Sequence, residues 1–429
     1  MTARGARRPR IFYGWYIAAA GFLSQFMFGV LMFHSFGTYV ALMQADFGWS
    51  RTTFSFAFAA QRIESGVLGP IQGWVIDTYG PRKVMIFGIV LFSVGFVLLS
   101  RVESLPLFYI SFTLIAIGSS LGSFLSVLVA IVNWFRRRRV LATGVLTMGF
   151  AVGGLTATPM ALLIEGIGWR DAAFASGVVS LIVGIPLALV VRHRPEPYGM
   201  LPDGVESAAS VAGEPEQIEW SMTAREALTT SAFWFLALGQ ASALLVIGAL
   251  MVHLVIYIHE DLGYTLGLAA LAVTIQTFGQ IIGQLLSTAF GDRVPKRPFV
   301  ILALLGHSAA MLLLALADGL PMIYVAVVIN GVAWGSRGPL MMGLRADYFG
   351  PRRFGTIMGF SSLVIMLGMI IGPVFAGVMY DETGSYRLGF IVLALVATLG
   401  SVMFLLVRPP AGREEWLAEA DRIAASRSP

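Results

Sequence analysis

Apolar runs of about 20 residues recur along the whole chain and alternate with short polar segments. A helix of about 20 apolar residues crosses the roughly 30 Å hydrocarbon core of a bilayer. Lipid offers the backbone no hydrogen-bond partner, so each run is predicted to be a membrane-spanning α-helix. The pattern predicts an all-α polytopic membrane protein with twelve such helices, at residues 11–45, 52–78, 83–101, 105–134, 138–166, 171–192, 229–259, 265–291, 297–317, 321–349, 353–380 and 386–408. Gly29 and Gly37 predict a bend in the long first helix.

Composition narrows the class of protein further. Only 12% of the 429 residues are charged and 57% are hydrophobic, whereas a soluble domain carries about 25% charged residues. The absence of cysteine excludes disulfides, thiol catalysis and cysteine-ligated metals. The net charge of +5 comes from basic residues at helix ends and not from one patch, so nucleic acid is not an expected partner. The first apolar run continues past residue 40 without a cleavage motif, which predicts a retained helix and not a signal peptide.

The distribution of lysine and arginine predicts the orientation. Of the 29 basic residues, 23 fall on the side of the two termini and four (Arg51, Arg101, Arg170 and Arg387) fall on the other side. Basic loops stay in the cytoplasm, so both termini are predicted to be cytoplasmic, in a plasma membrane of the bacterial inner-membrane type. Arg62 and Arg337 remain inside predicted spans.

The chain divides into two related halves. Residues 193–228 are rich in Pro, Gly, Ser and Glu, which predicts a flexible cytoplasmic linker between an N-terminal six-helix domain (1–192) and a C-terminal one (229–408). Residues 409–429 form a cytoplasmic tail in which 413–425 are predicted to be an amphipathic surface helix. An offset of 215 residues relates Asp46-Phe47-Gly48-Trp49 to Asp261-Leu262-Gly263-Tyr264, Gln61 to Gln276 and Asp77 to Asp292, and an offset of 214 relates Trp134-Phe135 to Tyr348-Phe349. Parallel six-helix repeats place a substrate site between the halves, near mid-membrane.

The loop after the second predicted helix carries a family resemblance. Its sequence, Gly73-Trp74-Val75-Ile76-Asp77-Thr78-Tyr79-Gly80-Pro81-Arg82-Lys83, resembles the G-x-x-x-D-R-x-G-R-R/K loop of the major facilitator superfamily, and Thr288-x-x-x-Asp292-Arg293 is a degenerate second copy. The resemblance covers essentially the whole chain and implies a monomeric twelve-helix transporter of two pseudo-symmetric bundles. It also implies a gating role at the cytoplasmic side for Asp77, Arg82, Lys83, Asp292 and Arg293.

A narrower resemblance concerns residues 133–144. Asn133-Trp134-Phe135-Arg136-Arg137-Arg138-Arg139-Val140-Leu141-Ala142-Thr143-Gly144 resembles the signature of monocarboxylate porters and oxalate–formate antiporters. Its aromatics and arginines are expected to contact the interface and the headgroups of membrane lipids. The chain has Gln280 and Gln284 where the animal porters have Asp and Arg, and His34-Ser35 where they have Lys-Ser. The substrate of the relatives is therefore not implied for this chain.

Arg337 is the leading candidate for substrate binding. A charge in hydrocarbon costs roughly 2.5–3.5 kcal/mol on insertion scales and marks a functional site by default. Arg337 lies ten residues before Asp347, or ~15 Å along a helix, which is mid-bilayer. Asn330, Trp334, Arg337 and Met341 share one helix face, which is predicted to border a central cavity. A structural ion pair is the alternative.

Other polar residues inside spans are secondary candidates. Gln276, Gln280 and Gln284 form one helix face and either line the cavity or hydrogen-bond between helices. Arg62 is a candidate second substrate ligand. Glu64 is either a proton carrier or the partner of an arginine.

Histidines add candidates for proton or substrate binding. His34, His253 and His307 lie in spans and titrate near neutral pH, although a lone helical histidine is more often only hydrogen-bonded. His253 shares a face with Tyr257, and both are substrate-site candidates. His34 is a candidate for substrate and for proton coupling. The sequence has no metal-ligand spacing, nucleophile–base pair or phosphate loop, so neither an enzyme nor a cofactor is expected.

These observations favour a secondary active transporter of a small organic anion, with a monocarboxylate and proton symport as the finer hypotheses. Two alternatives stay open. One is an exporter of amphipathic compounds, which aromatic and Met-rich helices would allow. The other is a non-transporting membrane sensor on the same fold.

Overall fold

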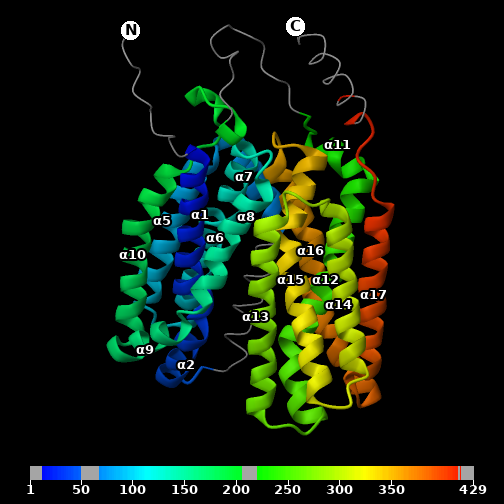
Figure 1. The fold of residues 1–429 in the computed structure, drawn as a ribbon. Helices are drawn as coiled ribbons and strands as arrows, with labels where there is room; N and C mark the ends of the chain where they lie inside the picture. The colour runs from blue at the N-terminus through cyan, green and yellow to red at the C-terminus, as the bar shows by residue number, and fades with distance from the viewer. Residues whose placement is uncertain (1–11, 50–66, 205–219, 414–415, 417–429) are drawn as a thin grey trace, which may run out of the picture.

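The computed structural model describes residues 12–49, 67–204, 220–413 and 416, which fold into two helical bundles standing side by side (Figure 1). The first bundle contains α1 (Tyr13–Phe28), α2 (Phe36–Phe47), α4 (Gly69–Tyr79), α5 (Pro81–Leu99), α6 (Leu105–Gly122), α7 (Phe124–Trp134), α8 (Arg139–Gly154), α9 (Ala157–Ile167) and α10 (Trp169–Val190). The second contains α11 (Ala224–Thr229), α12 (Ser231–Ile256), α13 (Leu266–Phe290), α14 (Lys296–Ala315), α15 (Leu320–Phe349), α16 (Phe354–Thr383) and α17 (Tyr386–Leu406). The described residues include no β-strand.

Nine helical stretches in the described part of the chain are long and apolar enough to cross a membrane. The predicted span 52–78 lies partly outside the described residues and is represented by α4. The predicted span 265–291 is α13, whose 25 residues extend ~37 Å. Both bundles begin and end at the same end of the molecule, which carries the loops with Arg82, Lys83 and Arg136–Arg139 and is called the basic end below (Figure 1).

Three predicted helices are interrupted. The first contains a π-helical turn, Gly29–His34, at the predicted bend. The fourth breaks at Ser123 between α6 and α7, and the fifth breaks at Leu155-Thr156 between α8 and α9. Hydroxyl groups bond to carbonyl groups beside the breaks, Ser126 Oγ to Leu121 O (2.7 Å) and Thr156 Oγ1 to Gly153 O (2.7 Å). Residues 105–134 nevertheless form one helical stretch long and apolar enough to cross a membrane, as predicted, whereas the predicted span 138–166 is divided into α8 and α9.

Both described ends of the predicted linker are attached to the bundle next to them. Asp203 accepts hydrogen bonds from the backbone N–H groups of Arg136 and Arg137. On the other side, Trp220 Nε1 donates to Tyr348 O (2.9 Å) and Met222 N donates to Phe349 O (2.9 Å). The helix α11 lies within the predicted linker and begins with a capping box at Thr223.

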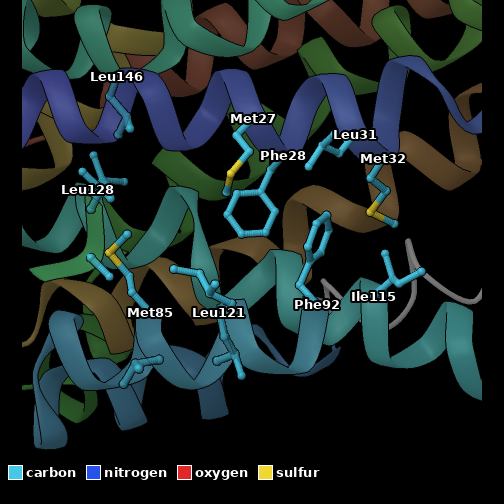
Figure 2. Close-up of a cluster of buried hydrophobic side chains, with 14 of the residues drawn as sticks. Met27, Phe28, Leu31, Met32, Met85, Phe92, Ile115, Leu121, Leu128 and Leu146 are labelled. Atoms are coloured by element: carbon cyan, nitrogen blue, oxygen red, sulfur yellow. The ribbon is translucent and has the colours of Figure 1, made fainter. Parts of the chain in front are cut away.

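The core of the first bundle is apolar. Met27, Phe28, Leu31 and Met32 face Phe92, Ile115 and Leu121 across it (Figure 2). Close contact of α5 with α6 depends on glycine, because a Cβ on Gly118 would collide with the backbone of Phe92. This bundle therefore packs as an ordinary membrane core.

Candidate functional site

Arg337 lies inside the second bundle on α15, and its side chain is only 3% exposed. Its Nε and Nη1 atoms have no hydrogen-bond partner among the described residues, and no described carboxylate pairs with it. A guanidinium group keeps its charge in proteins. Leaving a buried charge uncompensated is strongly unfavourable, so a structural ion pair does not explain Arg337 within the described residues.

The same face of α15 carries a chain of buried hydrogen bonds. Gln276 Nε2 on α13 donates to Asn330 Oδ1 (2.8 Å), and Asn330 Nδ2 donates to His307 Nδ1 on α14 (3.0 Å). Asn330 and His307 are fully buried. Two of the predicted site residues, Gln276 and Asn330, are thus brought together, and His307 joins them.

Close packing of α13 against α15 encloses this region. A Cβ on Gly331 or Gly335 would collide with the carbonyl oxygen of Gln276 or Gln280, respectively. Trp334 is half-buried and Met341 is fully buried. In this conformation the guanidinium group of Arg337 is therefore enclosed within the bundle, and its access to a central cavity stays a prediction.

The predicted glutamine face of α13 serves two different contacts. Gln276 bonds within its own bundle, whereas Gln284 Nε2 donates to Thr147 Oγ1 of α8 in the other bundle (2.8 Å). Gln280 between them is half-buried. Thr288 lies one turn after Gln284 on α13. A Cβ added to Gly144 of α8 would overlap the hydroxyl group of Thr288. The face therefore runs from the interior of one bundle to the contact between the two.

The histidine candidates are held by local contacts. His253 Nε2 donates to Pro373 O (2.9 Å), which leaves Nδ1 to accept from the hydroxyl group of Tyr386 (2.9 Å). Tyr257 donates to Leu314 O (2.6 Å). His34 Nε2 donates to Phe150 O across the α1–α8 contact (3.2 Å). These bonds occupy both ring nitrogens of His253, so its role in substrate binding stays a prediction.

Arg62 and Glu64 lie outside the described residues, so no geometry is assigned to either. The described part of the chain holds no group of three or more His, Asp or Glu residues suited to a metal ion.

Two aspartates join the bundles at the basic end. The carboxylate of Asp77, in the last turn of α4, accepts hydrogen bonds from the backbone N–H of Gly355 (3.2 Å) and from the N–H and hydroxyl group of Thr356 (2.8 and 2.7 Å). The Asp292 carboxylate accepts from the N–H groups of Val140 and Leu141 (2.8 Å each). Each aspartate therefore caps the first turn of a helix in the opposite bundle, where a negative charge is favourable.

The environment of Asp292 opposes its ionisation. Burial raises the pKa of the Asp292 carboxyl group, while the hydrogen bonds from Leu141 and Val140 act in the opposite direction. The other predicted gating residues do not cross between bundles in the described contacts: Arg82 Nε donates to Val191 O (2.9 Å), and Lys83 and Arg293 are exposed. An ion pair also crosses between the bundles: Asp347 of α15 pairs with Arg139 of α8 (3.6 Å). Asp347 pairs in addition with Lys296 of its own bundle (2.6 Å).

The sequence analysis did not anticipate a second buried arginine. Arg345, which was counted with the basic residues of the cytoplasmic side, is 1% exposed. Its guanidinium group makes only long contacts, to Met358 Sδ (4.0 Å) and Leu236 O (3.5 Å), and its Nε has no partner among the described residues. It lies eight residues after Arg337 on the same helix. The sequence gives this spacing, but position along a helix does not show that the side chain is buried.

A model of the Major Facilitator Superfamily matches residues 17–270 and 236–427 of the chain. The chain belongs to the major facilitator superfamily. It is a multi-pass membrane transporter and not an enzyme, with the twelve-helix, two-bundle fold of the superfamily. This confirms the family resemblance drawn from residues 73–83.

Curated relatives match nearly the whole chain at low identity. Human monocarboxylate transporter 11 is 27% identical over 435 residues, which cover 94% of this chain and 85% of that protein. The probable sulfoacetate transporter SauU of Cupriavidus necator is 24% identical, covering 86% of each chain. The oxalate:formate antiporter of Oxalobacter formigenes is 24% identical, covering 89% of this chain and 88% of the antiporter. These relatives confirm the narrower resemblance drawn from residues 133–144.

Solved structures agree on the fold. The Escherichia coli fucose:proton symporter FucP superposes with a TM-score of 0.71 at 15% identity, covering 92% of this chain and all of that one. The human organic anion transporter MFSD10 superposes with a TM-score of 0.67 at 15% identity, covering 93% of this chain and 100% of the other. At this identity the likeness concerns the fold alone.

Proposed function

We propose that the protein is a secondary active transporter of a small organic anion, that its substrate class is the monocarboxylates, and that it works by proton-coupled alternating access. The observation that carries this proposal is the buried Arg337 with two guanidinium nitrogens lacking a partner among the described residues. A carboxylate binds a guanidinium group with two parallel hydrogen bonds. Such an anion would supply the charge and the acceptors that the described residues do not.

The relatives support the same substrate class. The printed names of three of them concern monocarboxylates, sulfoacetate, and oxalate with formate, and all of these substrates are small carboxylates. Because identity is at most 27% among these relatives, the particular carboxylate is not transferred to this chain. Arg337 lies on α15, whereas the resemblance implies that the animal porters hold the anion from the helix corresponding to α13.

The contacts at the basic end suggest which side is closed. With both termini in the cytoplasm, as the distribution of basic residues predicts, Asp77 and Asp292 close the cytoplasmic side of the transporter. Access from that side would require both aspartates to leave the helix ends that they cap. Alternating access then consists of making and breaking these two caps as the bundles rock about the central site.

The test is a ligand-stability screen of purified protein with formate, acetate, lactate and oxalate. A carboxylate should raise the thermal unfolding midpoint of the wild type and of Arg408→Gln, an exposed control at the end of α17. The midpoint of Arg337→Gln should not respond. If no carboxylate stabilises the wild type, or if Arg337→Gln responds equally, the anion site does not exist as proposed.

A further inference from the structure

The hydrogen-bond chain through Asn330 has a defined direction. Asn330 Nδ2 is a donor only, so the His307 Nδ1 that it contacts must be an acceptor. The proton of the neutral ring is therefore on Nε2, which is buried and has no hydrogen-bond partner among the described residues. A buried donor without an acceptor is destabilising, so stability of the fold does not explain this arrangement.

The hydrogen bonds through Asn330 can also run in the opposite direction. If His307 gains a proton at Nδ1, that nitrogen becomes a donor, and Asn330 must turn its amide to present Oδ1. Asn330 Nδ2 then faces Gln276, which must present Oε1 in turn. Both amides carry a donor and an acceptor, so the two hydrogen bonds that link the three side chains can form in either direction without moving a helix. Protonation of His307 is thereby transmitted to Gln276 on α13, the helix that contacts the other bundle through Gln284.

Arg337 is the charged group that bears on this equilibrium. It lies two turns after Asn330 on the same face of α15, ~10 Å along the helix from the residue that His307 contacts. The other described helices around His307 contribute no competing charge in the membrane: α13 has no charged residue, and α17 has none between residues 388 and 406. The titratable group of α12, His253, lies toward the far end of its helix and is bonded to Tyr386 and Pro373. Arg345 lies on α15 itself, two turns beyond Arg337.

Like charges disfavour each other in a medium of low dielectric constant. With Arg337 empty, a second positive charge on His307 is opposed. An anion bound to Arg337 cancels that opposition, and one added proton then restores the single net positive charge that the site had before binding. Anion and proton are thus expected to bind together.

We propose that His307 is the proton-binding residue of the transporter and takes up one proton at Nδ1 when a carboxylate occupies Arg337. This inference rests on the proposed anion site and deepens it. The proton comes from solvent, the carboxylate stays ionised, and no bond other than N–H forms. It names a different residue from Glu64 and His34, the proton-coupling candidates of the sequence analysis, and those two stay predictions.

The experiment is isothermal titration of the full-length purified protein with lactate, acetate and oxalate, each in HEPES and in Tris buffer. The two buffers differ in ionisation enthalpy, so the difference in heat gives the number of protons taken up per anion. The wild type should take up about one proton, and its affinity should fall by up to about tenfold per pH unit as pH rises. His307→Asn keeps an acceptor toward Asn330 but does not titrate, so it should bind the anion without proton uptake and without pH dependence.

Two further variants make the result decisive. His259→Asn, which alters an exposed histidine after α12, should behave as the wild type. His307→Gln gives the same readout if His307→Asn does not fold. Proton uptake that persists in the folded His307 variant overturns the inference and places the proton elsewhere, as does anion binding by the wild type without proton uptake. Absence of any anion binding by the wild type overturns the proposed function itself, and the inference with it.

Discussion

The two bundles of this transporter share a fold but fill their interiors with different chemistry. In the first bundle, the residues around Phe28 and Phe92 form a continuous apolar core (Figure 2). In the second, Arg337, His307 and Asn330 are buried together. The internal repeat, at its offset of 214 residues, places Ser123 of the first bundle where the second has Arg337.

Ser123 and Arg337 differ in whether their polar atoms have partners within the described residues. Ser123 finds an acceptor within its own bundle by donating to Gln25 Oε1 of α1. Arg337 leaves two nitrogens without a described partner, which destabilises the empty protein. A residue retained at the expense of stability is typical of a binding site. The asymmetry therefore supports the proposal that the anion binds in the second bundle.

The largest expected effect is on anion affinity. Arg337→Gln removes a buried charge-assisted contact and should weaken carboxylate binding by on the order of 100-fold or more. Arg337→Lys should recover only part of this loss, because an ammonium group does not make the two parallel hydrogen bonds. Isothermal titration measures both affinities. Equal affinity of Arg337→Gln and wild type would show that the buried arginine of the second bundle does not bind the anion.

The next largest effect is on the thermal unfolding midpoint. Substitutions at Ser123 and Arg337, the two positions related by the repeat, should shift this midpoint in opposite directions. Ser123→Arg places a charge in a core without a partner and should destabilise the protein by roughly 2.5–3.5 kcal/mol. Arg337→Met removes such a charge and should raise the unfolding midpoint of the ligand-free protein. Thermal unfolding in detergent measures both shifts. Shifts in the same direction would show that the two interiors tolerate charge equally.

Both bundles contribute to the contacts that close the basic end. A larger side chain at a glycine in these contacts should hold the bundles apart. A side chain at Gly73 would collide with the carbonyl oxygen of Gly355 on α16, so Gly73→Val should hold α4 and α16 apart. Because the chain has no cysteine, spin labels at Arg137→Cys and Arg352→Cys report the separation by pulsed electron resonance. Gly166→Val, at a glycine with no atom within 4 Å of an added Cβ, is the matched control. An unchanged label distance in Gly73→Val would show that this contact does not close the basic end.

The smallest effect concerns the charge of Asp292. Because burial raises the pKa of this carboxyl group in the closed form, the closed form holds a proton more tightly than a form in which the carboxylate is hydrated. Acidification between the ordinary and the raised pKa should therefore favour closure. Asp292→Asn, which keeps an acceptor, should stay closed, whereas Asp292→Ala should lose about 1 kcal/mol of closure. The same spin labels measure this balance, and a shift toward the open form on acidification would contradict the sign.

Much of the fold could be predicted from the sequence because hydrophobic length and basic loops are local properties. The burial of Arg337 was expected from its place inside a predicted span, ten residues before Asp347. The burial of Arg345 did not, because a residue count gives depth along a helix but not the neighbour that the side chain meets. The contact of His307 with Asn330 depends on the packing of α14 against α15, which no local pattern records. The breaks at Ser123 and Leu155 lie within apolar runs, and no pattern of hydrophobic residues marks them.

The central claim is that Arg337 binds the transported anion, and uptake of a labelled carboxylate into proteoliposomes tests it most directly. Wild type should accumulate the carboxylate identified in the stability screen with saturable kinetics, and Arg408→Gln should do the same. Arg337→Gln, folded and reconstituted at equal density, should not exceed protein-free liposomes. Uptake by Arg337→Gln at the wild-type rate would contradict the account.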